Sequence, residues 1–118
     1  MSTKPSESWA SDPQACGLRV EVSPERSLLL PFDQFTFSEL TSEGKEQRLR
    51  LVFTTHEVVV RGHALRRLET VMQRMELSLI AKAPDGSRSL AAEGQPVIFE
   101  IIVNAVNPPS SAAQNSNN

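Results

Sequence analysis

The two histidines and the glutamate beside one of them are the first residues in this chain that could do chemistry. His56 and Glu57 precede a run of three valines, and His63 follows it shortly afterwards. A zinc-protease motif needs two histidines four residues apart on one helix face, with a glutamate between them. Here the histidines flank a predicted strand, so they would lie about 20 Å apart at roughly 3.3 Å per residue. We therefore predict two turn histidines and no metal site.

Other catalytic motifs are missing from the sequence. It contains no G-x-S-x-G elbow, no dinucleotide-binding glycine motif and no P-loop. A Ser–His–Asp triad is defined by geometry, so the sequence leaves it open. Glu69 and Glu76 share one predicted helix edge, where the simplest interpretation is two solvated carboxylates. We expect a protein that is not an enzyme and that needs no cofactor.

Arginine side chains are the best remaining candidates for a binding site, because a guanidinium group suits carboxylate and phosphate forks. Residues 45–82 carry eight Lys/Arg against four Asp/Glu, whereas residues 1–44 carry three against seven. An acidic partner, or the acidic N-terminal segment itself, could therefore lie against the basic middle of the chain. The candidate partner-binding residues are Arg48, Arg50, Arg61, His63, Arg66, Arg67 and Arg74.

The composition ranks the possible partners. A second copy of the chain or an acidic protein comes first. Nucleic acid is a possible but less favoured partner, because the net charge is −2 and the chain has no Tyr to stack on bases. No run approaches the roughly 20 apolar residues of a membrane span, and the N-terminus lacks a signal-peptide core. Cys16 is the only cysteine, so no intrachain disulfide can form. We expect no membrane contact and a cytoplasmic location.

One amphipathic helix is predicted over residues 63–75. At 100° per residue its apolar residues fall within roughly 120° of one another, which is typical of a core-facing stripe. The start lacks a capping Ser, Thr, Asp or Asn, so this boundary is poorly defined. The apolar stripe contains Ala64, Leu65, Leu68, Val71, Met72 and Met75. One polar flank contains His63, Arg66, Arg67 and Arg74, and the other contains Glu69 and Glu76.

Strands are predicted by alternating polar and apolar residues on both sides of this helix. Gly62 is expected to end one strand by permitting a backbone turn before the helix. The segment 97–103 is apolar on both faces except at Glu100, which indicates a central strand. Tight turns between strands favour antiparallel pairing. The predicted strands are 18–22, 28–30, 35–40, 47–54, 58–60, 76–82 and 97–103.

These elements predict a small α+β domain over residues 16–104. An antiparallel sheet, or a two-layer β roll, would pack against one amphipathic helix. Residues 1–15 and 105–118 are expected to be disordered tails, and Trp9 would either pack locally or dock to a partner. The favoured function is a non-catalytic interaction or assembly module that forms homo-oligomers. The alternative is a nucleic-acid-binding module that uses the arginine-rich helix flank and adjoining strands.

Overall fold

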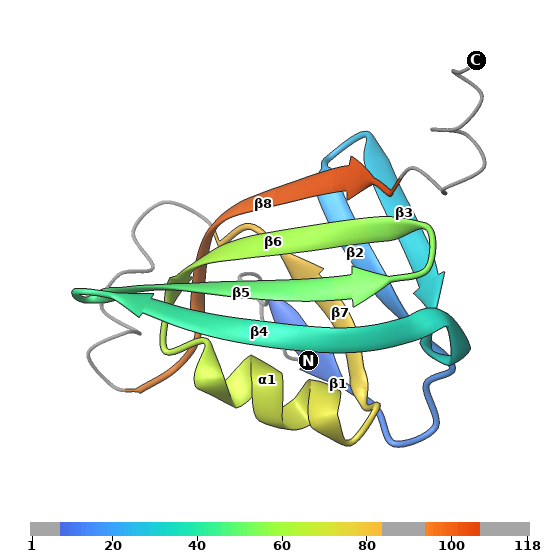
Figure 1. Ribbon diagram of the computed structural model, residues 1–118, viewed down its shortest axis with the longest axis horizontal. Coiled ribbons are helices and arrows are strands. Elements are labelled where there is room, and N and C mark those ends of the chain that lie inside the picture. The colour runs from blue at the N-terminus through green and yellow to red at the C-terminus, as the bar shows by residue number, and fades with distance from the viewer. Residues whose placement is uncertain (1–7, 84–93, 107–118) are drawn as a thin grey trace, which may run out of the picture.

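Two four-stranded sheets face each other across an apolar core, and one helix lies along one side of the pair (Figure 1). The computed structural model describes residues 8–83 and 94–106. In the first sheet the order is β1 (Trp9–Ser11), β7 (Leu77–Ala81), β2 (Gly17–Ser23) and β3 (Arg26–Pro31). In the second it is β4 (Phe35–Glu43), β5 (Glu46–Phe53), β6 (His56–His63) and β8 (Val97–Ala105). A 3₁₀ turn, η1 (Phe32–Gln34), joins β3 to β4, and the helix α1 (Arg66–Gln73) joins β6 to β7.

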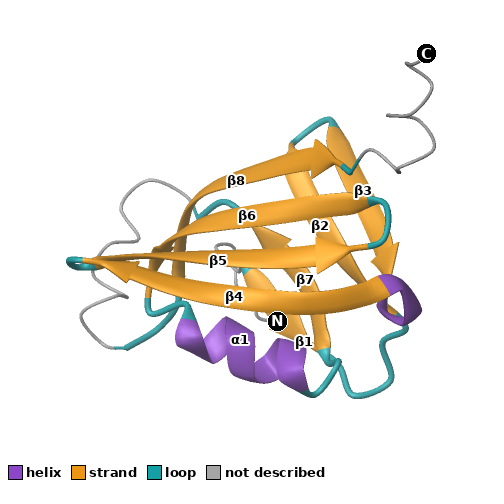
Figure 2. Cartoon of the chain, viewed as in Figure 1, coloured by secondary structure: helices purple, strands orange, loops and turns teal. Residues whose placement is uncertain are grey.

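Strands dominate the described chain, as Figure 2 shows, and the predicted α+β class with one helix is confirmed. The alternation predicted for residues 18–22 and 47–54 places one face of β2 and β5 in the core. Valines of β6 and residues of α1 complete this core from the second sheet and the helix. The fully buried residues include Leu18, Val20, Leu49, Leu51, Phe53, Val58, Val60, Leu65, Leu68 and Met72.

The helix is shorter than predicted: it covers Arg66–Gln73 and not residues 63–75. Ala64 and Met75 both have a φ of 57°, so the backbone turns left-handed just before and just after α1. No side chain of the N-cap residue caps the start of α1, but a side chain from another strand bonds to the backbone there. The backbone N–H of Leu65 donates a hydrogen bond of 2.7 Å to Oε1 of Gln47, which comes from β5. A neighbouring strand therefore satisfies a group that the local sequence leaves unpaired.

The expectation of uniformly antiparallel pairing is wrong at one place. β2 and β7 run parallel. Four strands, β3 to β6, and the helix lie between them in the chain, so β7 enters the first sheet through a long crossover, as parallel pairs require. The other strand pairs are antiparallel.

The predicted positions of Gly62 and of the last strand are also corrected. Gly62 does not end its strand but lies buried inside β6, where a Cβ atom would be 1.9 Å from the carbonyl oxygen of Val97. The close approach of β8, and not a turn, requires glycine there. Within the described residues β8 pairs only with β6, at one edge of the second sheet. The outer face of β8 is partly exposed at Glu100 and Ile102, so its apolar residues do not mark a strand that is covered on both faces.

The prediction of a disordered tail over residues 1–15 is wrong from residue 8 onward. β1 pairs with β7, and Ser8 accepts a hydrogen bond of 2.7 Å from the N–H of Ala81. Trp9 packs against the core, which ties this short strand to the domain. At the other end, Ala105 still belongs to β8, while residues 1–7 and 107–118 of the predicted tails lie outside the described part of the chain. No helix in the described ranges has the length and apolar character needed to cross a membrane.

Candidate partner-binding surface

The predicted binding residues fall into two groups that lie on different elements. The sheet group contains Arg48 and Arg50 of β5 with Arg61 and His63 of β6. Alternate residues of these strands enter the core, so the sheet group projects from the outer face of the second sheet. The helix group contains Arg66 and Arg67 of α1 and Arg74 directly after it.

Arg50 lies between two carboxylates on neighbouring strands. Glu39 of β4 is its direct cross-strand neighbour, and Oε1 of Glu39 lies 3.5 Å from Nη1 of Arg50. Nε of Arg50 donates a hydrogen bond to Oε2 of Glu57 on β6. The hydrogen bond to Glu57 is the main cause of a raised pKa for the Arg50 guanidinium. The guanidinium carbon also lies 5.4 Å from the ring centroid of Phe37, in cation–π range.

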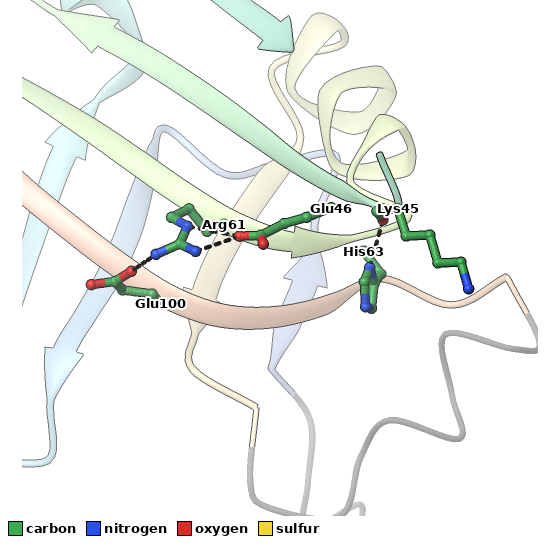
Figure 3. Close-up of polar contacts among 5 residues, drawn as sticks. All are labelled: Lys45, Glu46, Arg61, His63 and Glu100. Carbon is green, nitrogen blue, oxygen red and sulfur yellow. Dashed lines mark hydrogen bonds and ion pairs between the residues drawn. The ribbon is translucent and has the colours of Figure 1, made fainter. Parts of the chain in front are cut away.

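Arg61 has the same arrangement one strand further along (Figure 3). Its Nε and Nη2 atoms both lie 2.7 Å from Oε2 of Glu46. Its Nη1 atom donates a 2.6 Å hydrogen bond to Oε1 of Glu100, its cross-strand neighbour on β8. These bonds, first to Glu46 and then to Glu100, raise the pKa of Arg61. We call Glu39–Arg50–Glu57 and Glu46–Arg61–Glu100 the two triads; each holds one guanidinium between two carboxylates.

His63 has a structural role at the end of β6. Its Nδ1 atom lies 2.8 Å from the carbonyl oxygen of Lys45, which can only accept, so we assign the proton to Nδ1 (Figure 3). Its ring packs edge-on against Phe99 with centroids 4.7 Å apart. His56 instead contacts Oγ1 of Thr55 at 2.8 Å. Residues 8–83 and 94–106 hold no group of three His, Cys, Asp or Glu side chains that could bind a metal ion.

The helix group is less neutralised than the two triads. Nη1 of Arg66 lies 3.9 Å from Oε1 of Glu69, one turn along α1. The guanidinium carbon of Arg67 lies 5.7 Å from the ring centroid of Trp9, so the tryptophan connects β1 to the helix. Arg74 is exposed and has no carboxylate within 4 Å among the described residues. Arg48, on the sheet, likewise has no described ion pair.

A groove between α1 and β4 was not predicted from the sequence. It has a volume of about 430 Å³ and is lined by Phe35 and Ser38 of β4, Glu69 and Gln73 of α1, and Met75. These residues come from two segments far apart in the chain. No local pattern marks the groove, because it exists only where the helix lies beside the edge of the sheet.

Apolar side chains are exposed on both edge strands of the second sheet. Phe37 on β4 is 47% exposed and Ile102 on β8 is 39% exposed. On the first sheet, Leu29 of β3 is 61% exposed. Comparison of the chain with protein-family models, with curated proteins and with solved structures finds no match. What the protein does must therefore be inferred from its own surface.

Proposed function

We propose that this chain is a non-catalytic interaction module that binds a second copy of itself. One observation carries the proposal: the two edge strands of the second sheet leave Phe37 and Ile102 exposed to solvent. Within the described residues, β4 pairs only with β5 and β8 only with β6. Edge strands that present apolar side chains favour association with another chain.

The charges on this sheet support a second copy over an acidic partner. A two-fold interface brings one surface patch against the same patch of another subunit, so it is best served by a patch that holds both signs. The two triads supply both signs side by side. Arg50 and Arg61 already have two carboxylates each, and an acidic partner would bring further negative charge to them.

We also propose that the chain is not an enzyme. Thr55 and His56 form a hydroxyl–imidazole contact of 2.8 Å, which is the starting element of a nucleophile–base pair. Both residues lie at the β5–β6 turn, and no described carboxylate bonds to the other ring nitrogen to orient it. A cytoplasmic location is also proposed, supported by the single exposed thiol of Cys16.

Light scattering over a concentration series, at low and at high salt, tests the proposal. We expect a dimer or larger assembly, weakened by Phe37→Ser where the β4 edge forms the contact and by Ile102→Ser where the β8 edge forms it. Leu29→Ser is the matched control, because it removes a more exposed apolar residue from the other sheet. A monomer at every concentration would overturn the proposal. An oligonucleotide titration at low salt would then test the nucleic-acid alternative, which predicts strong salt dependence. Four of its six candidate arginines lie outside the two triads.

A further inference from the structure

The groove between α1 and β4 has polar groups with unused hydrogen-bonding capacity. The Ser38 hydroxyl and the Gln73 amide make no side-chain hydrogen bond with any described residue. Within residues 8–83 and 94–106, the Glu69 carboxylate has one cation near it, Arg66, at the long distance of 3.9 Å. Phe35 and Met75 provide apolar walls. The groove therefore suits a group that combines a positive charge with an apolar stem.

Met75, at the rim of this groove, is held in an unfavourable backbone conformation. Its N–H donates to Met72 O at 2.8 Å and the N–H of Glu76 donates to Val71 O at 3.1 Å, which is the Schellman pattern that ends many helices. The position has a φ of 57°, where glycine is the usual residue. Strain of this kind is often retained at functional positions. A glycine would relieve it but would remove the apolar side chain, 39% exposed, from the groove.

Arg74 lies beside this groove and supplies a cation of the required kind. It is exposed, and its neighbours Gln73 and Met75 both line the groove. At 3.6 residues per turn, positions five apart on a helix point about 140° away from each other. Arg74 therefore does not close onto Glu69 of its own chain, and no ion pair joins them. Among the residues that the structure describes, one chain thus carries an unpaired cation and a poorly compensated carboxylate close to the same groove.

We propose that two copies of the chain meet at this groove, with Arg74 of each copy paired to Glu69 of the other. The inference rests on the proposed self-association and assigns it to the β4 edge beside α1, so that Phe37→Ser, and not Ile102→Ser on the opposite edge, is expected to weaken the dimer. A two-fold axis beside α1 forms both ion pairs at once, because in such an interface the contact from residue i to j is repeated from j to i. The arginine stems and Met75 then cover the apolar walls of the two grooves.

Charge reversal in separate chains tests the pairing. Glu69→Arg places arginines against Arg74 in both contacts of a homodimer, and Arg74→Glu places glutamates against Glu69 in both. We expect each variant to raise the dimer Kd at least about tenfold. An equimolar mixture should restore dimers, since each heterodimer contact again joins Arg to Glu. The double variant should also dimerise. Analytical ultracentrifugation, with one variant labelled, measures all four samples.

The controls separate an interface effect from a loss of folding. Arg19→Glu and Glu21→Arg reverse exposed charges on β2 and should leave the dimer unchanged. Urea unfolding checks that every variant remains folded. Met75→Gly should weaken the dimer without lowering the stability of the monomer, which a purely structural role for Met75 does not predict.

The outcomes distinguish this inference from the proposal it rests on. If the wild type dimerises and neither reversal weakens it, the interface lies elsewhere and self-association stands without the groove. If both reversals weaken the dimer but their mixture fails to restore it, the charges act indirectly and the inference is overturned. If the wild type is a monomer at every concentration, both the inference and the proposed function fail.

Discussion

The arginines of the two triads and the arginines of the helix have opposite surroundings. Arg50 and Arg61 are each held by two carboxylates that come from neighbouring strands of the second sheet or its β4–β5 hairpin. On the helix side, Arg66 has one distant carboxylate, and Arg74 has none among the described residues. Both groups come from the basic middle of the sequence. Whether one of these arginines is available to a partner therefore depends on its ion pairs with neighbouring strands, and not on the local excess of basic residues in the sequence.

The helix arginines have fixed surroundings only if α1 is packed on the core. Leu68→Ala tests this packing and should have the largest effect on the free energy of unfolding. Leu68 is fully buried in the core shared by the helix and both sheets. Removing a buried leucine side chain loses apolar burial and leaves a cavity. We expect the free energy of unfolding in urea to fall by about 2–5 kcal/mol.

Thr70→Ala is the control for this change, because Thr70 is exposed on the same helix. It should alter the free energy of unfolding by at most about 0.5 kcal/mol. A loss near zero for Leu68→Ala would mean that the helix arginines are carried by an element not packed on the core.

Gly62→Ala should have a smaller effect on the free energy of unfolding, through the packing of β6 against β8, the strands that carry Arg61 and Glu100. In Gly62→Ala the new Cβ would lie 1.9 Å from the carbonyl oxygen of Val97, so β8 must move relative to β6. Such overpacking costs about 1–3 kcal/mol. The same shift should loosen the contact between Arg61 and Glu100, which joins these strands. Chemical denaturation measures the cost.

Gly44→Ala, in the β4–β5 turn, is the matched control for the glycine. There the φ is +67° and a Cβ would meet no atom within 4 Å, so only the left-handed backbone is penalised, by about 1 kcal/mol. Equal losses at the two positions would show that close approach of β8 is not what Gly62 permits.

Much of the fold could be predicted because its signals are local. Alternation in residues 47–54 identifies β5 and its buried face, and the apolar spacing of Leu65, Leu68 and Met72 identifies the buried side of the helix. The parallel pairing of β2 with β7 could not be predicted, because it depends on where a distant strand enters the sheet. The helix ends were also missed, since the left-handed turns at Ala64 and Met75 occur without glycine.

For the candidate binding residues, the sequence names the arginines but not the side chains with which they pair, and their role in binding stays a prediction. The arginine positions follow from the sequence, yet their neutralisation depends on cross-strand register. Glu39 lies opposite Arg50, and Glu100 lies opposite Arg61, only because β4–β5 and β6–β8 pair as they do. An alternation pattern assigns each residue to a face, but it does not assign a neighbour on the next strand.

The difference between the two groups can be measured directly by removing one cation from each. We expect Arg61→Gln to lower the free energy of unfolding more than Arg66→Gln, because the first change leaves two carboxylates without a cation and the second leaves one. Added salt should reduce the difference, since the pairs are partly solvated. Equal effects would contradict the assignment of the triads as the more strongly paired group.

The pH dependence of that difference follows from the raised pKa of Arg61. Hydrogen bonding to Glu46, and then to Glu100, favours the charged guanidinium in the folded state. A group whose pKa is raised on folding stabilises the protein below its unfolded pKa, and loses that contribution only as pH rises through the folded value. For a guanidinium this window is strongly alkaline. The difference should therefore be the same at neutral and at mildly alkaline pH.

The smallest expected effect separates the arginines within the helix group. Arg67→Ala removes the guanidinium above the Trp9 ring, and an exposed cation–π contact contributes about 0.5–1 kcal/mol. Arg74→Ala should leave the stability of the monomer unchanged, because no described carboxylate or ring contacts it. In a Trp9→Leu background, which keeps an apolar side chain but no ring, Arg67→Ala should lose most of its effect. A persistent effect would mean that Arg67 stabilises the helix itself and does not join it to β1.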